Sequence, residues 1–262
     1  MLTRRRFLTA AAQLALSAGC AAKEGNMDES RSPASLVARP PGSHPPRSLP
    51  GPGKHLLGLE QVRDSLLYLP PALHSADPAG LLVILHGAGG DAAAGVSLLA
   101  PLADKYGLAL LAPASRQSTW DAIRHGYGPD VAVINRALDR VFRTIPVHPG
   151  QVGIAGFSDG ASYALGLGLA NGGLFRHIVA FSPGFIPPAP RVGKPAIFVS
   201  HGNNDSVLPI DSTSRKIVPA LRRDGYDVTY REFDGGHTVT WESAREAVEW
   251  LGWEPPGHGE TS

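Results

Sequence analysis

The sequence predicts an α/β domain built on a mostly parallel, twisted sheet with helices on both faces. Seven short apolar runs alternate with segments of helical spacing from Leu56 onward. Several runs, such as "LLVIL" and "AIFV", are continuously apolar, which is typical of strands buried on both faces. Strands that alternate with helices in this way favour parallel pairing. The length of 262 residues suffices for one such domain of ordinary size, or for two small ones.

The expected elements follow one another in a simple order along the chain. One helix is expected on the apolar stripe from Val131 to Ile145, with Asp130 as its N-terminal cap, and a second begins near Gly160. A last helix carries the stripe from Trp241 to Leu251. Strands are expected over residues 62–70, 80–87, 107–114, 151–158, 177–184, 196–202 and 227–234. Ligands of parallel sheets bind beyond the carboxyl ends of strands, so the chemistry is expected there.

The first 54 residues predict an export signal followed by a tether. Residues 1–20 combine three arginines, a short apolar run and small residues, and "TRRRFL" resembles the twin-arginine export signature. The apolar run is too short to span a membrane. Residues 21–54 are rich in Pro and Ser without apolar periodicity, which predicts a disordered linker. The folded domain is then expected over residues 55–254, with a flexible tail at 255–262.

Cys20, the only cysteine, leaves two fates open for the exported chain. It follows Ser17-Ala18-Gly19 as in a bacterial lipoprotein cleavage site, although the leucine stands four residues before it instead of the usual three. The cysteine is therefore either lipidated, which would anchor the protein to a membrane, or an ordinary residue of the leader. The protein is expected in the periplasm, at the cell surface or outside the cell. A lone cysteine also excludes an internal disulfide framework.

The charge balance argues against nucleic acid as a partner. The formal net charge is +1, and Arg4, Arg5 and Arg6 lie in the predicted leader. The rest of the chain is therefore slightly acidic and offers no basic field. The expected partner is a small molecule, and the oligomeric state stays open.

The segment "IAGFSDGAS" has the pattern of a nucleophile elbow. Its residues 156–160 have the form G-x-S-x-G and lie between an expected strand and an expected helix. The two glycines allow strand and helix to pack almost in contact, while the sharp turn lifts the serine hydroxyl above the sheet. The N-terminus of the following helix favours a developing oxyanion. Ser158 is therefore the candidate nucleophile.

A serine hydroxyl needs a base and a carboxylate, and later strand ends supply both. His237 follows the last expected strand in "GGH", and Asp205 follows the strand before it in "HGNND". The chain order Ser, Asp, His is that of one large group of serine hydrolases. Asp211 and Asp234 are alternative third members. His201 is either a structural residue or a metal ligand, although no second ligand lies at metal spacing.

The loop "HGAGGD" after the first buried strand supplies the expected oxyanion hole. In it the backbone N–H of Ala88, or that of Gly89, pairs with the N–H of Asp159. His86 is expected to shape this loop through its ring rather than to act as a base. Trp120 and Gly89 are expected to contact substrate, although a buried position for the tryptophan fits the sequence equally well.

Four motifs together carry a family resemblance. From Leu66 to Leu251 the motifs "LHGAGGD", "GFSDGAS", "HGNNDSVLP" and "GGHT" resemble those of α/β-hydrolases. The chain is most similar to small bacterial serine esterases of the phospholipase/carboxylesterase group, with kinship to polyhydroxybutyrate depolymerase-like and dienelactone hydrolase-like proteins. It departs from the last group at Ser158, where those enzymes usually carry Cys. The resemblance implies the α/β-hydrolase fold and acyl-enzyme chemistry, with no cofactor and no metal.

These observations predict a serine hydrolase that cleaves carboxylic esters. Polyester depolymerase, feruloyl-type esterase and serine peptidase activity remain alternatives within enzymes. A surface lipoprotein that keeps the fold as a binding module is the alternative outside enzymes, but such a module has no need of a strained serine elbow. Only "FIPPAPRVGKP" separates two strands where a lid would be inserted, so no lid domain and short-chain substrates are expected.

Overall fold

The computed structural model describes residues 32–42, 49–73 and 78–253 of the chain. The predictions for the export signal, Cys20 and the flexible tail lie outside these residues. Within them, no helix is both long enough and apolar enough to cross a membrane.

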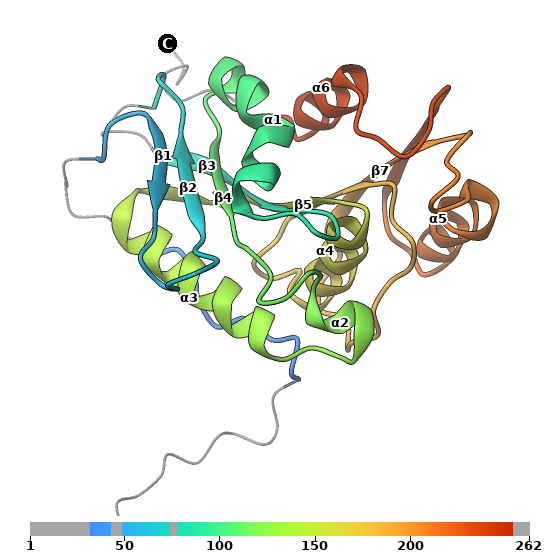
Figure 1. Ribbon diagram of the computed structural model, residues 1–262, viewed down its shortest axis with the longest axis horizontal. Coiled ribbons are helices and arrows are strands. Elements are labelled where there is room, and N and C mark those ends of the chain that lie inside the picture. Colours follow the sequence, from blue (N-terminus) through green and yellow to red (C-terminus); the bar gives the residue numbers. More distant parts are fainter. Residues whose placement is uncertain (1–31, 43–48, 74–77, 254–262) are drawn as a thin grey trace, which may run out of the picture. The chain divides into compact units, whose positions relative to one another are not determined.

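The core of the domain is one eight-stranded, mostly parallel sheet (Figure 1). Strands β1 and β2 pair antiparallel with each other and β2 pairs antiparallel with β4, while all other neighbours are parallel. The order across the sheet is β1-β2-β4-β3-β5-β6-β7-β8. The strands are β1 Gly53–Leu56, β2 Leu66–Leu69, β3 Ala79–Leu85, β4 Ala109–Ala112, β5 Val147–Phe157, β6 His177–Phe181, β7 Ala196–Gly202 and β8 Val228–Phe233. The seven expected strands are present, and β1 is an additional edge strand.

Helices cover both faces of the sheet, as predicted. Because successive side chains of a strand point to opposite faces, Leu81, Val83 and Leu85 of β3 face one core and Leu82 and Ile84 the other. The first core is closed by α3, α4 and α5, and the second by α1 and α6 (Figure 1). The helices are α1 Ala92–Tyr106, α2 Asp121–Arg124, α3 Pro129–Thr144, α4 Asp159–Ala170, α5 Ser214–Arg223 and α6 Trp241–Trp250.

Asp130 does not cap α3, contrary to the expectation. The cap position belongs to Gly128, and the carboxylate of Asp130 is buried. It accepts hydrogen bonds from the backbone N–H groups of Arg116 and Asp121, both at 2.8 Å. Burial raises the pKa of Asp130 above its ordinary value. The Asp130 carboxylate thus holds the loop after β4 through tertiary hydrogen bonds, which helix spacing in the sequence cannot predict.

The prediction of a disordered linker is wrong for residues 32–42, which we call the N-terminal strap. Ala34, Leu36 and Ala38 are buried in the core beside α3 and α4. The Asn171 side chain accepts from the Leu36 N–H at 2.8 Å and donates to the Ala34 carbonyl at 2.8 Å. Asn135 accepts from two further strap N–H groups. The compact unit therefore begins at Ser32 rather than at residue 55.

Candidate active site

Ser158 lies on a strained turn between β5 and α4. Its φ is 58° and its ψ is −121°, a conformation that side chains rarely adopt. A Cβ at Gly156 would lie 2.2 Å from the Gly160 carbonyl oxygen, and one at Gly160 would lie 2.3 Å from the Leu85 carbonyl oxygen. Both glycines are therefore required by the close approach of helix and strands, which holds the serine in this conformation.

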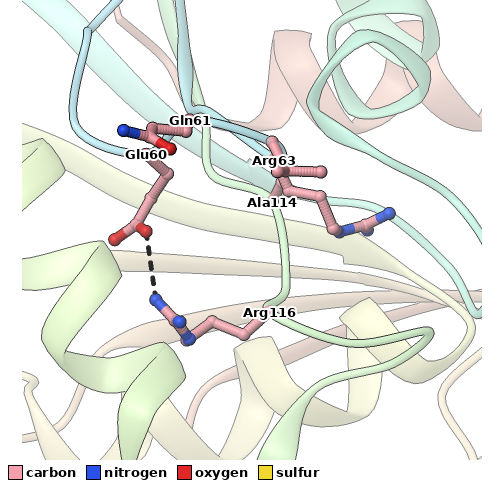
Figure 2. A pocket seen from close by; sticks show the side chains of 6 residues that line it. Glu60, Gln61, Arg63, Ala114 and Arg116 are labelled. Carbon is pink, nitrogen blue, oxygen red and sulfur yellow. Dashed lines mark hydrogen bonds and ion pairs between the residues drawn. The ribbon is translucent and has the colours of Figure 1, made fainter.

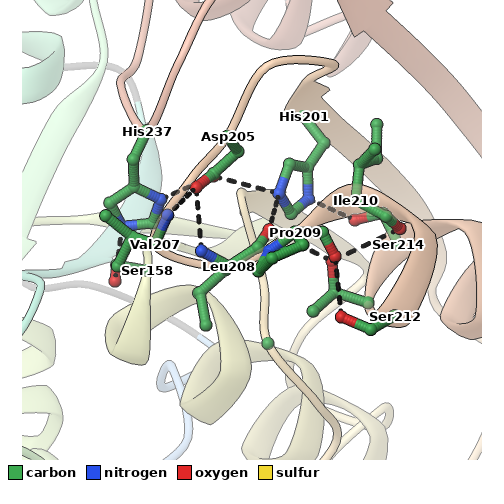
Figure 3. Close-up of polar contacts among 12 residues, drawn as sticks. Ser158, His201, Asp205, Val207, Leu208, Pro209, Ile210, Ser212, Ser214 and His237 are labelled. Carbon is green, nitrogen blue, oxygen red and sulfur yellow. Dashed lines mark hydrogen bonds and ion pairs between the residues drawn. The ribbon is translucent and has the colours of Figure 1, made fainter.

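The structure brings Ser158, His237 and Asp205 into one chain of hydrogen bonds (Figure 3). The Nε2 of His237 lies 2.9 Å from the Ser158 Oγ, and its Nδ1 lies 2.6 Å from Oδ2 of Asp205. Asp205 follows β7, and His237 lies in the loop between β8 and α6. Because an ionised carboxylate only accepts, Nδ1 carries the proton and Nε2 is free to accept from the serine hydroxyl.

Asp205 is buried, yet its surroundings favour its ionised form. Burial alone would raise its pKa, but the N–H groups of Leu208, His237 and Val207 outweigh that effect and hold the pKa below its ordinary value. The two backbone N–H groups both bind Oδ1, at 2.8 and 2.9 Å. The carboxylate is thus kept charged and fixed in front of the imidazole.

The alternative carboxylates have other partners. Asp211 forms an exposed ion pair with Arg215, and Asp234 accepts a hydrogen bond from Asn204. Within the described residues, neither is hydrogen-bonded to the His237 ring, whose partners are Asp205 and Ser158. His201, which the sequence left open as a metal ligand, has both ring nitrogens engaged by neighbouring protein groups.

Two backbone N–H groups near the serine are free to bind an anion. Among the described residues, those of Ala88 and Asp159 have no hydrogen-bond partner. The N–H of Gly89, the alternative donor, is taken by the Ser118 carbonyl at 2.6 Å. The structure therefore favours Ala88 over Gly89 as the first donor. Gly89 itself is exposed on the same loop, so its predicted contact with substrate stays a prediction.

Trp120 does not line a substrate cleft, contrary to the expectation. Its side chain is fully buried, and its Nε1–H donates to the His86 carbonyl at 2.9 Å. The indole packs against the rings of His86 and Tyr163 at centroid distances of 4.8 and 5.2 Å. Trp120 thus supports the loop that begins at His86.

His86 and Arg63 brace the same loop. The Nδ1–H of His86 donates to the Gly87 carbonyl at 2.7 Å, and its Nε2 accepts from the Ser115 N–H at 3.1 Å. Burial lowers the pKa of His86, which favours the neutral ring that these two bonds require. Arg63 donates to the carbonyls of Ser115 and Gly90, both at 2.6 Å. No sequence motif marked this arginine, because its contacts are formed only by the tertiary structure.

Arg63 also lines a hollow of about 330 Å³ between the β1–β2 loop and the loop after β4. Its side chain points away from the ion pair of Glu60 and Arg116, which joins the two loops at 3.1 Å (Figure 2). The lining residues are Glu60, Gln61, Val62, Arg63, Ala114 and Arg116. No member of the Ser158 hydrogen-bond chain lines this hollow.

The sheet order, the serine elbow and the comparisons together define an α/β-hydrolase fold. Residues 131–251 match the phospholipase/carboxylesterase family. The structure resembles esterase PE8 (TM-score 0.59, 24% identity, 71% of this chain and 95% of that one). It also resembles a phospholipase/carboxylesterase from Dyadobacter fermentans (0.56, 21%, 71% and 95%) and a fluorophosphonate-binding serine hydrolase of Staphylococcus aureus (0.56, 16%, 72% and 92%).

No curated protein sequence matches the chain. The resemblance expected from the sequence is nevertheless confirmed: residues 131–251 match the phospholipase/carboxylesterase family, and the solved esterases share the α/β-hydrolase fold. The family match supports a hydrolase of carboxylesterase type.

Proposed function

We propose that the protein is a serine esterase that hydrolyses carboxylic esters through an acyl-enzyme on Ser158. The observation that carries this proposal is the continuous hydrogen-bond chain from Ser158 through His237 to Asp205, beside two unpartnered N–H groups of the described chain. These are the parts that acyl transfer needs: a nucleophile, a base, an orienting carboxylate and an anion site.

The proposed reaction has two halves. His237 Nε2 takes the hydroxyl proton while the Ser158 Oγ bonds to the ester carbonyl carbon, and the carbonyl oxygen becomes negative. The N–H groups of Ala88 and Asp159 bind that oxygen. As the C–O bond to the alcohol breaks, His237 returns the proton to the leaving oxygen. A water, deprotonated by His237, then attacks the acyl carbon. The bond from that carbon to Oγ breaks as His237 returns the proton to Oγ, which releases the carboxylic acid and restores Ser158. Asp205 stabilises the imidazolium in both halves.

The proposed substrates are water-soluble esters with short acyl chains. The segment from Phe185 to Pro195, between β6 and β7, contains no helix. A lid inserted there could cover a long acyl chain, and this segment is too short and too rich in proline to form one.

Export of the enzyme, with or without lipid on Cys20, is a separate proposal. It depends on the "TRRRFL" and Ser17-Ala18-Gly19-Cys20 motifs alone. Mass spectrometry of the mature N-terminus tests the lipid anchor. A diacylglycerol mass on Cys20 would support anchoring, and a mature chain that starts beyond residue 20 would contradict anchoring.

Covalent labelling tests the proposed activity most directly. The full chain is treated with a fluorophosphonate probe, and peptide mapping locates the adduct, with Ser162 of α4 and Ser182 after β6 as internal controls. We expect one adduct on Ser158, together with turnover of p-nitrophenyl acetate. A correctly folded protein that neither labels at Ser158 nor cleaves any of a panel of esters would refute the proposal.

A further inference from the structure

Asp205 is contacted by two imidazoles, of which the proposed mechanism uses only one. The Nε2 of His201, on β7, lies 3.1 Å from Oδ2, the same oxygen that binds His237 (Figure 3). The side chains of His201 and Asp205 are both fully buried, whereas that of His237 is 15% exposed. The second imidazole therefore lies behind the carboxylate, out of reach of solvent.

The hydrogen bonds of His201 determine which of its nitrogens carries the proton. Its Nε2 faces two acceptors, Oδ2 of Asp205 and the Leu208 carbonyl at 2.9 Å, so this nitrogen must donate. Its Nδ1 lies 2.7 Å from the Ser214 Oγ and accepts from that hydroxyl. Burial lowers the pKa of His201, in keeping with a neutral ring. The single Nε2–H is thus shared between its hydrogen-bond acceptor, the Leu208 carbonyl, and Oδ2 of Asp205 at 3.1 Å, and the neutral ring places no second positive charge beside the carboxylate.

With His201 included, the carboxylate of Asp205 is contacted by four N–H groups. Oδ1 accepts hydrogen bonds from the backbone N–H groups of Val207 and Leu208, and Oδ2 accepts one from His237 and lies 3.1 Å from the Nε2 of His201. Both oxygens of this buried carboxylate thus face two donors each. Rotation of the group would break bonds on both oxygens at once. His201 provides the second contact to Oδ2, the oxygen that orients the base.

We propose that His201, oriented by Ser214, is a positioning residue that keeps Oδ2 of Asp205 directed at His237. The inference rests on the proposed function, since it assigns a role within that same site. The competing explanation is that His201 only stabilises the loop after β7, which it also ties together through the Leu208 carbonyl. The two explanations predict different values of kcat for a variant that replaces the ring but keeps a donor at the Nε2 position.

The test compares two substitutions in the full chain, His201→Leu and His201→Gln, with p-nitrophenyl acetate as substrate. Leucine removes the donor, and we expect kcat to fall about tenfold, as for one lost hydrogen bond to a charged group, with KM unchanged. The amide nitrogen of glutamine can occupy the place of Nε2, so His201→Gln should recover most of kcat. His177→Leu is the matched control. His177 is the first residue of β6, at the end of that strand away from Ser158, and its ring packs against Trp250 and Trp253.

Two results would overturn the inference. The first is a folded His201→Leu protein with the wild-type kcat, and the second is a folded His201→Gln protein as slow as His201→Leu. If His201→Leu does not fold, Ser214→Ala decides, because it removes only the hydroxyl that orients the ring. That variant should lose about threefold in kcat at constant KM, somewhat less than a full hydrogen bond contributes. A wild-type kcat in Ser214→Ala would then count against the proposal.

The rate of fluorophosphonate labelling separates this inference from the proposed function. Labelling requires an activated Ser158 but not the natural substrate, and Ser158→Ala gives the background. If the wild type does not label, the proposed function and this inference fall together. If the wild type labels and His201→Leu labels equally fast, only the role of His201 is refuted. Slower labelling of His201→Leu that His201→Gln restores would support it.

Discussion

The two sides of the candidate site are built in different ways. On the acid side, backbone N–H groups and two imidazoles surround the buried charge of Asp205, and most of these groups come from residues 201–214. On the oxyanion side, Arg63, His86 and Trp120 bind backbone carbonyl and N–H groups of loops far apart in sequence. The acid side is therefore a local motif, whereas the oxyanion side is an assembly that only the completed fold creates.

The largest expected loss of kcat comes from the substitution of Ser158. Ser158→Ala removes the nucleophile that the two sides serve, and kcat should fall by about 10⁴ or more while the fold survives, because triad members act as a unit. Steady-state ester hydrolysis and thermal unfolding measure the two quantities. Near-normal turnover by pure, folded Ser158→Ala protein would contradict the mechanism.

The acid side alone is tested by Asp205→Asn. An amide cannot fix the Nδ1–H tautomer of His237, so kcat should fall by about 10³ to 10⁴. Asp234→Asn is the matched control. Among the described residues the Asp234 carboxylate hydrogen-bonds the exposed Asn204 side chain alone, so this substitution should leave kcat unchanged. If Asp234→Asn were the damaging substitution and Asp205→Asn were not, the assignment of the acid would be wrong.

The oxyanion side alone is tested by Arg63→Met. Methionine keeps much of the side-chain volume but loses the bonds to the Ser115 and Gly90 carbonyls, so the loop with Ala88 should be less well held. We expect kcat to fall about tenfold, the effect of slightly misplacing one oxyanion donor, with little change in KM. Arg116→Met is the control, because Arg116 lines the same hollow and pairs with Glu60. Equal kcat values for Arg63→Met and Arg116→Met would show that Arg63 does not support the site.

The same contrast explains how far the sequence alone could lead. Continuous apolar runs predicted the parallel strands, and G-x-S-x-G with a later Asp and His predicted the three residues that the fold brings together. Trp120 and Asp130 were misassigned because each is engaged by a partner distant in sequence, His86 and Arg116 respectively. Strand β1 was missed because "GKHL" has no apolar pattern, and its pairing with β2 defines it. Local chemistry can be predicted from spacing, while tertiary bracing cannot.

The N-terminal strap illustrates this bracing outside the site and gives a smaller effect. Asn171→Ala would leave the Leu36 N–H and the Ala34 carbonyl unpaired in the core, so the free energy of unfolding should fall by about 2 kcal/mol. Denaturant unfolding measures this, with the exposed Asn203→Ala as the control. Removing residues 1–53 should lower Tm, whereas removing residues 1–31 should not. Equal Tm values for the two truncations would show that the strap contributes nothing to stability.

The smallest expected effect concerns the acyl chain, whose binding depends on neither side of the site. Each methylene that the protein buries contributes about 0.8 kcal/mol, but only if something covers it. The connection from Phe185 to Pro195 has no helix, and the Phe185 side chain is 40% exposed. We therefore expect kcat/KM for p-nitrophenyl esters to vary only a few-fold from acetate to hexanoate and then to decline, with no jump when the substrate forms micelles. A steady rise toward long chains would show that another loop covers the acyl chain, and Trp120, being buried, could not be the residue responsible.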